Sequence, residues 1–332
     1  MIDTIYLEEG VESLPKTEQV LRRFPRASVI RCKHYKEVFN PSAQSFRLQK
    51  KKPALILAKQ TGKHIHSIPP SYGIGGKNNF YFSHLLNCLY DCRYCFLQGM
   101  YPSAHYVLFV NFDDFKEEIK KMAFSCSEDT WFFSGYDCDS LALESITGFA
   151  ADFLPFFDQL PNTWIELRTK SVAIESLKKT KPLDRAVVAF SFTPDEISSQ
   201  LEHGVPRVDA RIKAMSTLAD KGWKVGLRID PLIDSVDFEA RYAALFEKIF
   251  DHVSGESVHS VSLGAYRMPS GFMKKIEKQY PDDAFFAANL QTNNGMIGYG
   301  EDTEKRLKQI CSDLLESWMD KSKIFTCEIN NK

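Results

Sequence analysis

The chain has 332 residues, of which 44% are hydrophobic and 26% charged, and its formal net charge is −1. This composition can bury a sizeable core, and the length predicts about two domains or one large α/β domain with additions. The first residues lack a charged segment followed by an apolar run, and no uncharged stretch is long enough to span a bilayer. We therefore expect a cytoplasmic protein with no membrane partner.

Residues 1–75 are predicted to form a separate N-terminal region, with a helix over 14–24, a strand over 54–58 and a Pro- and Gly-rich loop over 68–76. Residues 21–63 contain a single acid, Glu37, and twelve basic residues: Arg22, Arg23, Arg26, Arg31, Lys33, Lys36, Arg47, Lys50, Lys51, Lys52, Lys59 and Lys63. Such a segment favours a polyanion as partner. The alternative is a solvated surface whose charge is balanced by acids that are close in space.

Beyond residue 76, short apolar runs alternate with amphipathic segments. Strands are expected at 79–84, 130–135, 163–169, 186–192, 224–229 and 258–264. Helices are expected at 112–125, 140–157, after 170, 209–221, 238–250 and after 270. Six strand–helix units in succession predict a parallel sheet covered by helices, over 76–281, with ligands bound at the carboxyl ends of the strands. Residues 282–332 are expected to close the sheet, with a helix over 302–318 and a strand over 324–329.

Three cysteines follow the first of these strands in the pattern C-x3-C-x2-C: Cys88, Cys92 and Cys95. Three thiolates on one loop can hold three irons of a 4Fe-4S cluster and leave the fourth iron free to chelate a small molecule. A structural zinc site normally takes four ligands, and the other five cysteines form no second pair. A disulfide framework does not suit a long chain without a secretory signal. Three inert buried cysteines are the remaining alternative.

This cysteine pattern resembles the signature of the radical S-adenosylmethionine (SAM) enzymes. The resemblance implies that SAM binds the free iron through its amino and carboxylate groups. Reductive cleavage then gives methionine and a 5'-deoxyadenosyl radical, which abstracts hydrogen from a substrate. It also implies an α/β fold with a partial (β/α)6 barrel of the TIM type, in agreement with the six strand–helix units.

Five segments together narrow the resemblance: 88–98, 139–144, 167–170, 190–192 and 266–281. In their order they resemble the spore photoproduct lyase family over roughly residues 80–300. The resemblance implies a radical SAM lyase that repairs a methylene-bridged thymine dimer in DNA by direct reversal. The basic segment 21–63 would contact DNA phosphates, and an electron donor such as flavodoxin or ferredoxin would reduce the cluster.

The same resemblance assigns roles to individual residues. Cys88, Cys92 and Cys95 match the cluster ligands, and the backbone carbonyls of Ser134 and Gly135 stand where the amino group of SAM is received. Asp139, Lys170 and Ser191 fall where the family places SAM-contacting groups. The ordinary alternatives are a helix cap for Asp139, a surface position for Lys170 and a helix-facing strand position for Ser191.

The hydrogen-return residues depart from the family pattern. The family carries a thiol just after the second strand and two tyrosines around the third cluster cysteine. Here Tyr94 matches the first tyrosine, Phe96 stands in place of the second, and Tyr136 stands in place of the thiol, with Cys138 two residues further on. One hypothesis makes Cys138 the hydrogen donor and Tyr94 the remaining relay. The alternative to a donor role is an inert loop thiol.

Two further functions stay open at this point. One alternative to the lyase is a radical SAM enzyme that acts on another nucleic-acid or small-molecule substrate. The other is a non-catalytic DNA-binding iron-sulfur redox sensor. Arg267, just after the sixth strand, is expected to be solvated, with a phosphate contact as the alternative.

Overall fold

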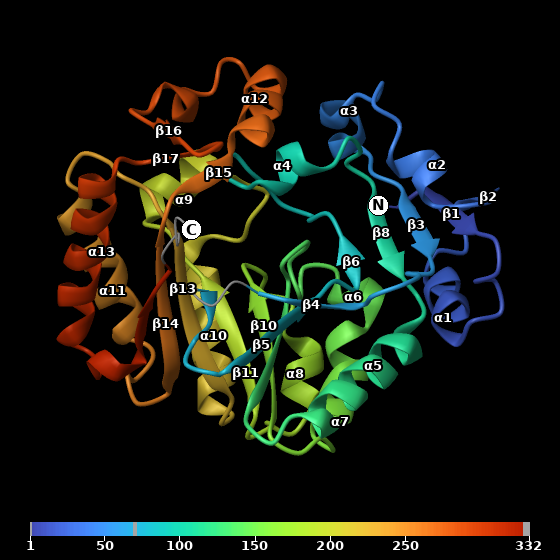
Figure 1. Ribbon diagram of the computed structural model, residues 1–332, viewed down its shortest axis with the longest axis horizontal. Coiled ribbons are helices and arrows are strands. Elements are labelled where there is room, and N and C mark those ends of the chain that lie inside the picture. The colour runs from blue at the N-terminus through green and yellow to red at the C-terminus, as the bar shows by residue number, and fades with distance from the viewer. Residues whose placement is uncertain (1, 69–71, 328–332) are drawn as a thin grey trace.

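Six parallel strands form the centre of an eight-stranded sheet that curls into a half-barrel (Figure 1). The computed structural model describes residues 2–68 and 72–327. The strands, in sheet order, are β4 (Ile65–Ser67), β5 (Asn78–Phe82), β9 (Thr130–Ser134), β10 (Thr163–Thr169), β11 (Ala186–Ser191), β13 (Lys224–Leu232), β14 (Val258–Ala265) and β18 (Ile324–Thr326). Only β4 runs antiparallel to its neighbour. The predicted α/β half-barrel is therefore confirmed, and its strands are apolar because both faces are covered.

Helices line the outer face of the half-barrel (Figure 1). They are α5 (Phe112–Ser125), α7 (Phe149–Phe157), α8 (Glu175–Lys179), α10 (Val208–Asp220), α11 (Phe238–Phe250) and α13 (Glu301–Glu316). Each buries one apolar face against the strands; in α11, for example, Tyr242, Phe246 and Ile249 are fully buried. The helices predicted at 112–125 and 238–250 have the predicted bounds.

The predicted single helix over 140–157 is wrong. The chain forms α6 (Glu144–Thr147) and α7, separated by Gly148, which has the left-handed φ of 59° that ends a helix readily. The Glu144 carboxylate accepts hydrogen bonds from the N–H groups of Ala150 and Ala151, which satisfies the start of α7. Residues 140–143 are thereby left to form a turn beside Asp139, at the carboxyl end of β9.

The N-terminal region contributes a second sheet, β2 (Ser28–Cys32), β1 (Thr4–Glu8), β3 (Leu55–Ala58), β8 (Tyr106–Phe109) and β6 (Leu85–Leu86), with helices α1 (Pro15–Arg23), α2 (Lys36–Phe39) and α3 (Phe46–Lys51). Strands from before and after residue 75 pair with one another in both sheets, because β3 pairs with β8 and β4 pairs with β5. One hydrophobic core continues through both sheets. The predicted division into 1–75, 76–281 and 282–332 stays a prediction.

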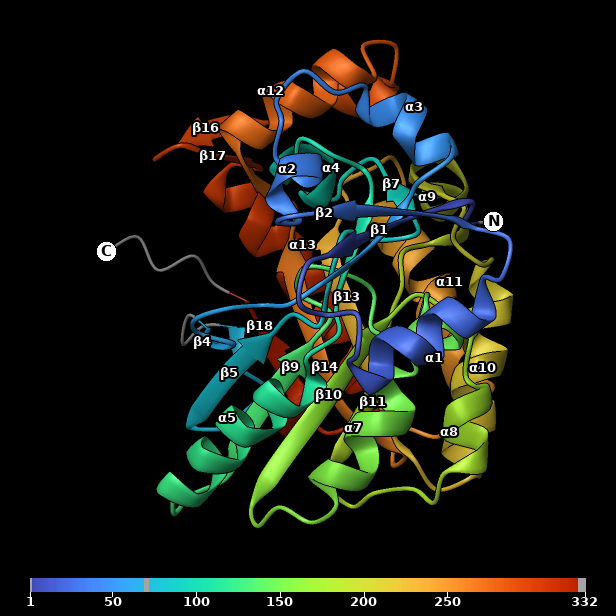
Figure 2. The same cartoon turned by 90° about the vertical axis from the view of Figure 1, so that its right-hand side faces the viewer.

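Small elements cover the carboxyl ends of the strands: β7 (Asp91–Cys92), α4 (Leu97–Met100), α9 (Asp195–Leu201), β12 (Glu202–His203), β15 (Arg267–Pro269), α12 (Ser270–Gln279), β16 (Gln291–Asn293) and β17 (Met296–Gly298). Figures 1 and 2 show α3, α4 and α12 together at this end of the molecule. Short 3-10 turns at Ala284–Ala287 and Lys321–Lys323 complete the C-terminal part. Of the predicted loop 68–76 and last strand 324–329, residues 69–71 and 328–329 lie outside the described residues.

Across the described residues, the structure contains no helix that is both long enough and apolar enough to cross a membrane.

Candidate functional site

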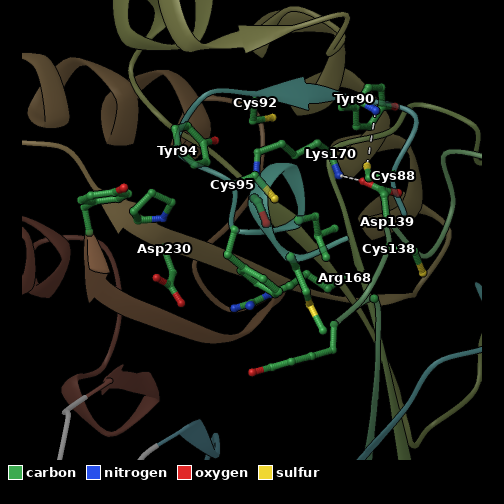
Figure 3. A pocket seen from close by; sticks show the side chains of 18 of the residues that line it. Cys88, Tyr90, Cys92, Tyr94, Cys95, Cys138, Asp139, Arg168, Lys170 and Asp230 are labelled. Carbon is green, nitrogen blue, oxygen red and sulfur yellow. Dashed lines mark hydrogen bonds between the residues drawn. The ribbon is translucent and has the colours of Figure 1, made fainter. Parts of the chain in front are cut away.

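A cavity of about 410 Å³ lies at the carboxyl ends of the parallel strands. Its walls include the predicted site residues Cys88, Cys92, Tyr94, Cys95, Gly135, Cys138, Asp139, Lys170 and Ser191. In Figure 3, Cys88, Asp139 and Cys138 lie along one side of the cavity, and Cys92 and Tyr94 lie on the other. Ser134 is the predicted site residue that does not line it: its hydroxyl donates to the Glu166 carbonyl, and it borders a smaller adjoining cavity that shares Gly135.

Backbone contacts hold the cysteine loop in place. Asn87 has a positive φ of 70°, and its amide donates to the carbonyls of Ser103 and His105 at 2.7 Å each, which turns the chain out of β6. Cys92 then pairs with Glu202 between β7 and β12, and the Arg93 N–H donates to the Leu201 carbonyl at 2.9 Å. The loop is therefore held at its start by Asn87 and at its middle by the β7–β12 pair.

The C-terminal segment holds the outer side of the same loop. Arg93 bonds the Asp283 carboxylate at 3.0 Å and stacks its guanidinium over the Tyr280 ring at 3.7 Å. The Tyr280 hydroxyl donates to the Asp91 carboxylate at 3.2 Å. Gly99 in α4 touches the backbone of Phe272 in α12 so closely that a Cβ atom there would lie 2.4 Å from the Phe272 oxygen.

The three thiols all line the cavity and are candidate ligands of a multinuclear centre. All are free, and burial raises the pKa of each, that of Cys88 to about 12. Bound iron cations would offset this cost of forming thiolates. Among the described residues, no three His, Cys, Asp or Glu side chains are close enough to hold one metal ion. Three cysteines around a cavity of this size instead fit the predicted 4Fe-4S cluster, in which each thiolate binds a different iron.

Asp139 links two loops of the site. Its Oδ1 accepts hydrogen bonds from the N–H groups of Leu141 (3.0 Å) and Ala142 (2.9 Å) and from the Thr169 hydroxyl (2.6 Å). Its Oδ2 accepts from the Lys170 N–H at 2.6 Å. Burial raises the pKa of Asp139, and these hydrogen bonds oppose the rise. Asp139 thus caps the turn that precedes α6, not a helix as the ordinary alternative predicted, and also fixes the backbone of Lys170.

A buried ionic network supports Tyr94 and Lys170. The Tyr94 hydroxyl donates to Glu202, and Glu202 pairs with Arg211 at 2.7 Å; the Glu202 and Arg211 side chains are fully buried. Lys170 Nζ lies 3.9 Å from Glu202 and 5.5 Å from the centre of the Tyr94 ring. Burial alone would raise the pKa of Glu202, but Arg211 and Lys170 hold it below its ordinary value.

Ser191 is tied to the same network, because Arg211 donates to its carbonyl at 2.8 Å. The sequence did not predict Glu202, in β12, or Arg211, in α10, because no spacing in the sequence relates them to the cysteines.

The two positions that depart from the family pattern meet in space. The rings of Phe96 and Tyr136 lie 5.8 Å apart, and Tyr136 also packs on Tyr81 at 4.6 Å. Tyr136 is 46% exposed, whereas Cys138 is 5% exposed and burial raises its pKa well above the ordinary value. Both residues line the cavity.

A third wall was not predicted as part of the site. Arg267 is nearly buried and donates to the Tyr72 hydroxyl at 2.9 Å and to Asp230 at 3.4 Å, so the expectation of a solvated arginine is wrong. Arg168 and Asp230 also face the cavity. Strand-end placement was the available signal for Asp230, but β13 ends at Leu232, three residues beyond its predicted end, and therefore includes it.

Neighbouring acids balance the basic segment in part. Arg22, Arg31, Lys52 and Lys59 pair with Glu18, Glu12, Asp3 and Asp114. Arg26, Lys33, Lys36, Lys51 and Lys63 are exposed and form no ion pair within the part of the chain that the structure describes. Lys50 turns inward and donates to the Cys88 carbonyl at 2.6 Å.

A half-barrel of parallel strands with a three-cysteine loop after its first long strand defines the radical SAM class of iron-sulfur proteins. Within that class, the family model of spore photoproduct lyase matches residues 78–325. The chain belongs to the spore photoproduct lyase family.

Known relatives agree with this membership. The chain is 24% identical over 198 residues to the spore photoproduct lyase of Geobacillus sp. (strain Y412MC61) and 25% identical over 198 residues to that of Bacillus subtilis (strain 168). Each match covers 58% of this chain and 58% of the relative.

Solved structures agree in fold over the whole chain. A spore photoproduct lyase variant with bound AdoMet and dinucleoside spore photoproduct has a TM-score of 0.86 at 17% identity, covering 99% of both chains. A spore photoproduct lyase complexed with dinucleoside spore photoproduct has a TM-score of 0.84 at 18% identity, covering 99% of this chain and 98% of that one. Streptococcus suis SuiB, bound to its precursor peptide, is a more distant likeness, with a TM-score of 0.52 at 14% identity over 78% of this chain and 50% of that one.

Proposed function

We propose that this protein is a radical SAM lyase that repairs a thymine-dimer lesion of the spore photoproduct type in DNA by direct reversal. The observation that carries the proposal is that Cys88, Cys92 and Cys95 line one cavity at the carboxyl ends of the parallel strands. Membership of the lyase family, and relatives whose structures hold AdoMet and the dinucleoside lesion, support the choice of cofactor and substrate.

The cysteines would hold the cluster, and SAM would bind its free iron; together they supply the reductive chemistry that makes a 5'-deoxyadenosyl radical. The backbone carbonyls of Ser134 and Gly135 would receive the SAM amino group. Asp139 keeps Lys170 in place through its 2.6 Å bond, and Lys170 and Ser191 would contact SAM from the ends of β10 and β11.

For the return of hydrogen we propose Cys138 as donor and Tyr94 as relay. Both line the cavity, and the burial of Cys138 keeps it as a neutral thiol, which is the form that carries a transferable hydrogen. The Glu202 carboxylate holds the Tyr94 hydroxyl in one orientation. The contact between Tyr136 and Phe96 favours a second candidate: a radical SAM enzyme with the same cofactor and a different substrate or final step.

The direct test uses anaerobically reconstituted protein with dithionite and SAM. The release of 5'-deoxyadenosine is followed with and without an oligonucleotide that carries the methylene-bridged dimer. Reversion of the lesion to two thymines supports the lyase. Cleavage of SAM with an intact lesion would instead favour the second candidate, and a cluster that never cleaves SAM would favour a redox sensor.

The proposed partner is damaged DNA, bound in part by the exposed cations of the basic segment, in a cytoplasmic setting with a flavodoxin or ferredoxin as electron donor. Charge reversal of Lys33 and Lys36 should weaken DNA binding and reduce its salt dependence, because fewer phosphate contacts mean that fewer counterions are released on binding. Reversal of the exposed Lys120 and Lys121 on α5 is the matched control. Equal losses in both variants would contradict a localised DNA surface.

A further inference from the structure

One lysine of the basic segment contacts the candidate cluster site directly. Lys50 Nζ donates a 2.6 Å hydrogen bond to the backbone carbonyl of Cys88, 38 residues away in sequence. Helix α3 fixes this direction, because Phe46 is buried and the Gln49 side chain accepts a hydrogen bond from the Ala104 N–H at 2.9 Å. Lys51, the next residue, is exposed.

Among the described residues, Lys50 has no acidic partner. Throughout residues 2–68 and 72–327, no carboxylate forms an ion pair with Lys50, whereas the nearby Lys52 pairs with Asp3 at 3.0 Å. Asp91, the acid within the cysteine loop, is paired with Arg93 at 2.8 Å. An unpaired, partly buried cation therefore contacts the backbone of Cys88, one of the three candidate ligands, and lies within electrostatic range of the site.

We propose that Lys50 is a positioning residue that sets the reduction potential of the cluster. This inference rests on the proposed cluster but on no particular substrate. Reduction by one electron makes the cluster and its thiolates more negative, so a fixed cation nearby stabilises the reduced form more than the oxidised form. The potential of a cluster follows its charge environment and exposure, and Lys50 supplies the charge from the N-terminal region. Its removal makes the cluster harder to reduce.

The test is a redox titration of the full-length reconstituted protein, with dithionite as the electron source and without SAM or DNA. The reduced cluster is quantified by electron paramagnetic resonance. In Lys50→Met, the ratio of reduced to oxidised cluster at a fixed potential should fall about tenfold, which corresponds to about 59 mV for one electron. Lys51→Met removes the same charge from the exposed side of α3 and should leave the midpoint unchanged, as should Lys50→Arg, which keeps the charge.

Three results would overturn the proposal: an unchanged midpoint in Lys50→Met, an equal shift in Lys51→Met, or a shift in Lys50→Arg as large as that in Lys50→Met. If Lys50→Met fails to load iron, Lys50→Gln is titrated in its place. Loss of the cluster from both would also overturn it, because Lys50 would then be a support of the loop. A wild-type chain that takes up no cluster defeats the proposed function and this inference together. A wild-type chain that repairs DNA, with identical potentials in all variants, defeats the inference alone.

Discussion

Replacement of Arg211 by methionine tests the buried network that supports the site. The guanidinium donates to Glu202 at 2.7 Å, to the Ser198 hydroxyl at 2.8 Å and to the Ser191 carbonyl at 2.8 Å, and its side chain is fully buried. Methionine fills similar space but leaves the Glu202 carboxylate without its main counter-charge. Breaking a buried pair in this way costs about 3–5 kcal/mol of unfolding free energy.

The expected change in melting temperature follows from the length of the chain. At about 2.1 cal/mol/K per residue, the unfolding entropy of 332 residues is about 0.7 kcal/mol/K, so the loss corresponds to a melting temperature lower by about 4–7 °C. Differential scanning calorimetry measures it. Lys248→Met is the control, because Lys248 pairs with Asp195 at the surface and its removal should cost about 1 kcal/mol or less.

The pH dependence gives an independent check. In the wild type the pKa of Glu202 is below its ordinary value, so its ionised form adds stability above the unfolded pKa of about 4.3, and this contribution is lost as the pH falls through the folded pKa. Without Arg211, burial raises the pKa of Glu202, and ionisation then destabilises the fold as the pH rises. The melting temperature of Arg211→Met should therefore fall further below that of the wild type at pH 8 than at pH 5. A deficit below about 1 °C, or one that does not change with pH, would refute the reasoning.

Three other outcomes are expected. Gly99→Ala should lower the urea midpoint by an amount equivalent to about 1–3 kcal/mol, because its Cβ would meet the Phe272 carbonyl, whereas Gly271→Ala, in open space on α12, should not. Asp139→Asn should weaken SAM binding about tenfold by calorimetry, because an amide nitrogen cannot accept the hydrogen bond from the Lys170 N–H; unchanged affinity would separate Asp139 from the SAM site. Cys138→Ala should keep the absorption of the cluster and the cleavage of SAM but lose lesion reversal, with the buried Cys311→Ala as control, and full repair by Cys138→Ala would remove the thiol from the mechanism.

The half-barrel was predictable from the sequence because its strands carry a local signal. Buried parallel strands are continuous apolar runs, and β11 (Ala186–Ser191) is such a run, which ends one residue before the predicted bound. The edge strand β2 has only the apolar pair Val29 and Ile30 between polar residues, and four of its five residues are exposed, so its apolar run is too short to predict a strand. The helix over 140–157 failed for a related reason, since the apolar pattern continues through Gly148 although the backbone turns there.

The candidate site was predictable only where its residues are close in sequence. The cysteine spacing predicted the centre of the site, and the resemblance to the lyase family pointed to Asp139, Lys170 and Ser191, with strand-end placement as further support for Lys170 and Ser191. The contacts that hold the centre connect distant parts of the chain: Tyr94 with Glu202, 108 residues apart, and Arg93 with Asp283, 190 residues apart. No local pattern encodes such pairs, because each depends on how the chain returns to the same edge of the sheet.

The residues that match the family pattern and the residues that depart from it lie in different parts of the cavity. The cysteines, Asp139 and Lys170 are fixed by the loop contacts, by β12 and by the core, so a substitution there disturbs the fold as well as the site. Tyr136 is half exposed, and its ring packs on the rings of Phe96 and Tyr81, so we expect this wall to change without loss of the cluster loop. Differences in the substrate or in the return of hydrogen are therefore best sought by exchanging Tyr136 and Phe96 together. A change in product with unchanged SAM cleavage would confirm that the wall of Tyr136 and Phe96 acts separately from the cysteine loop.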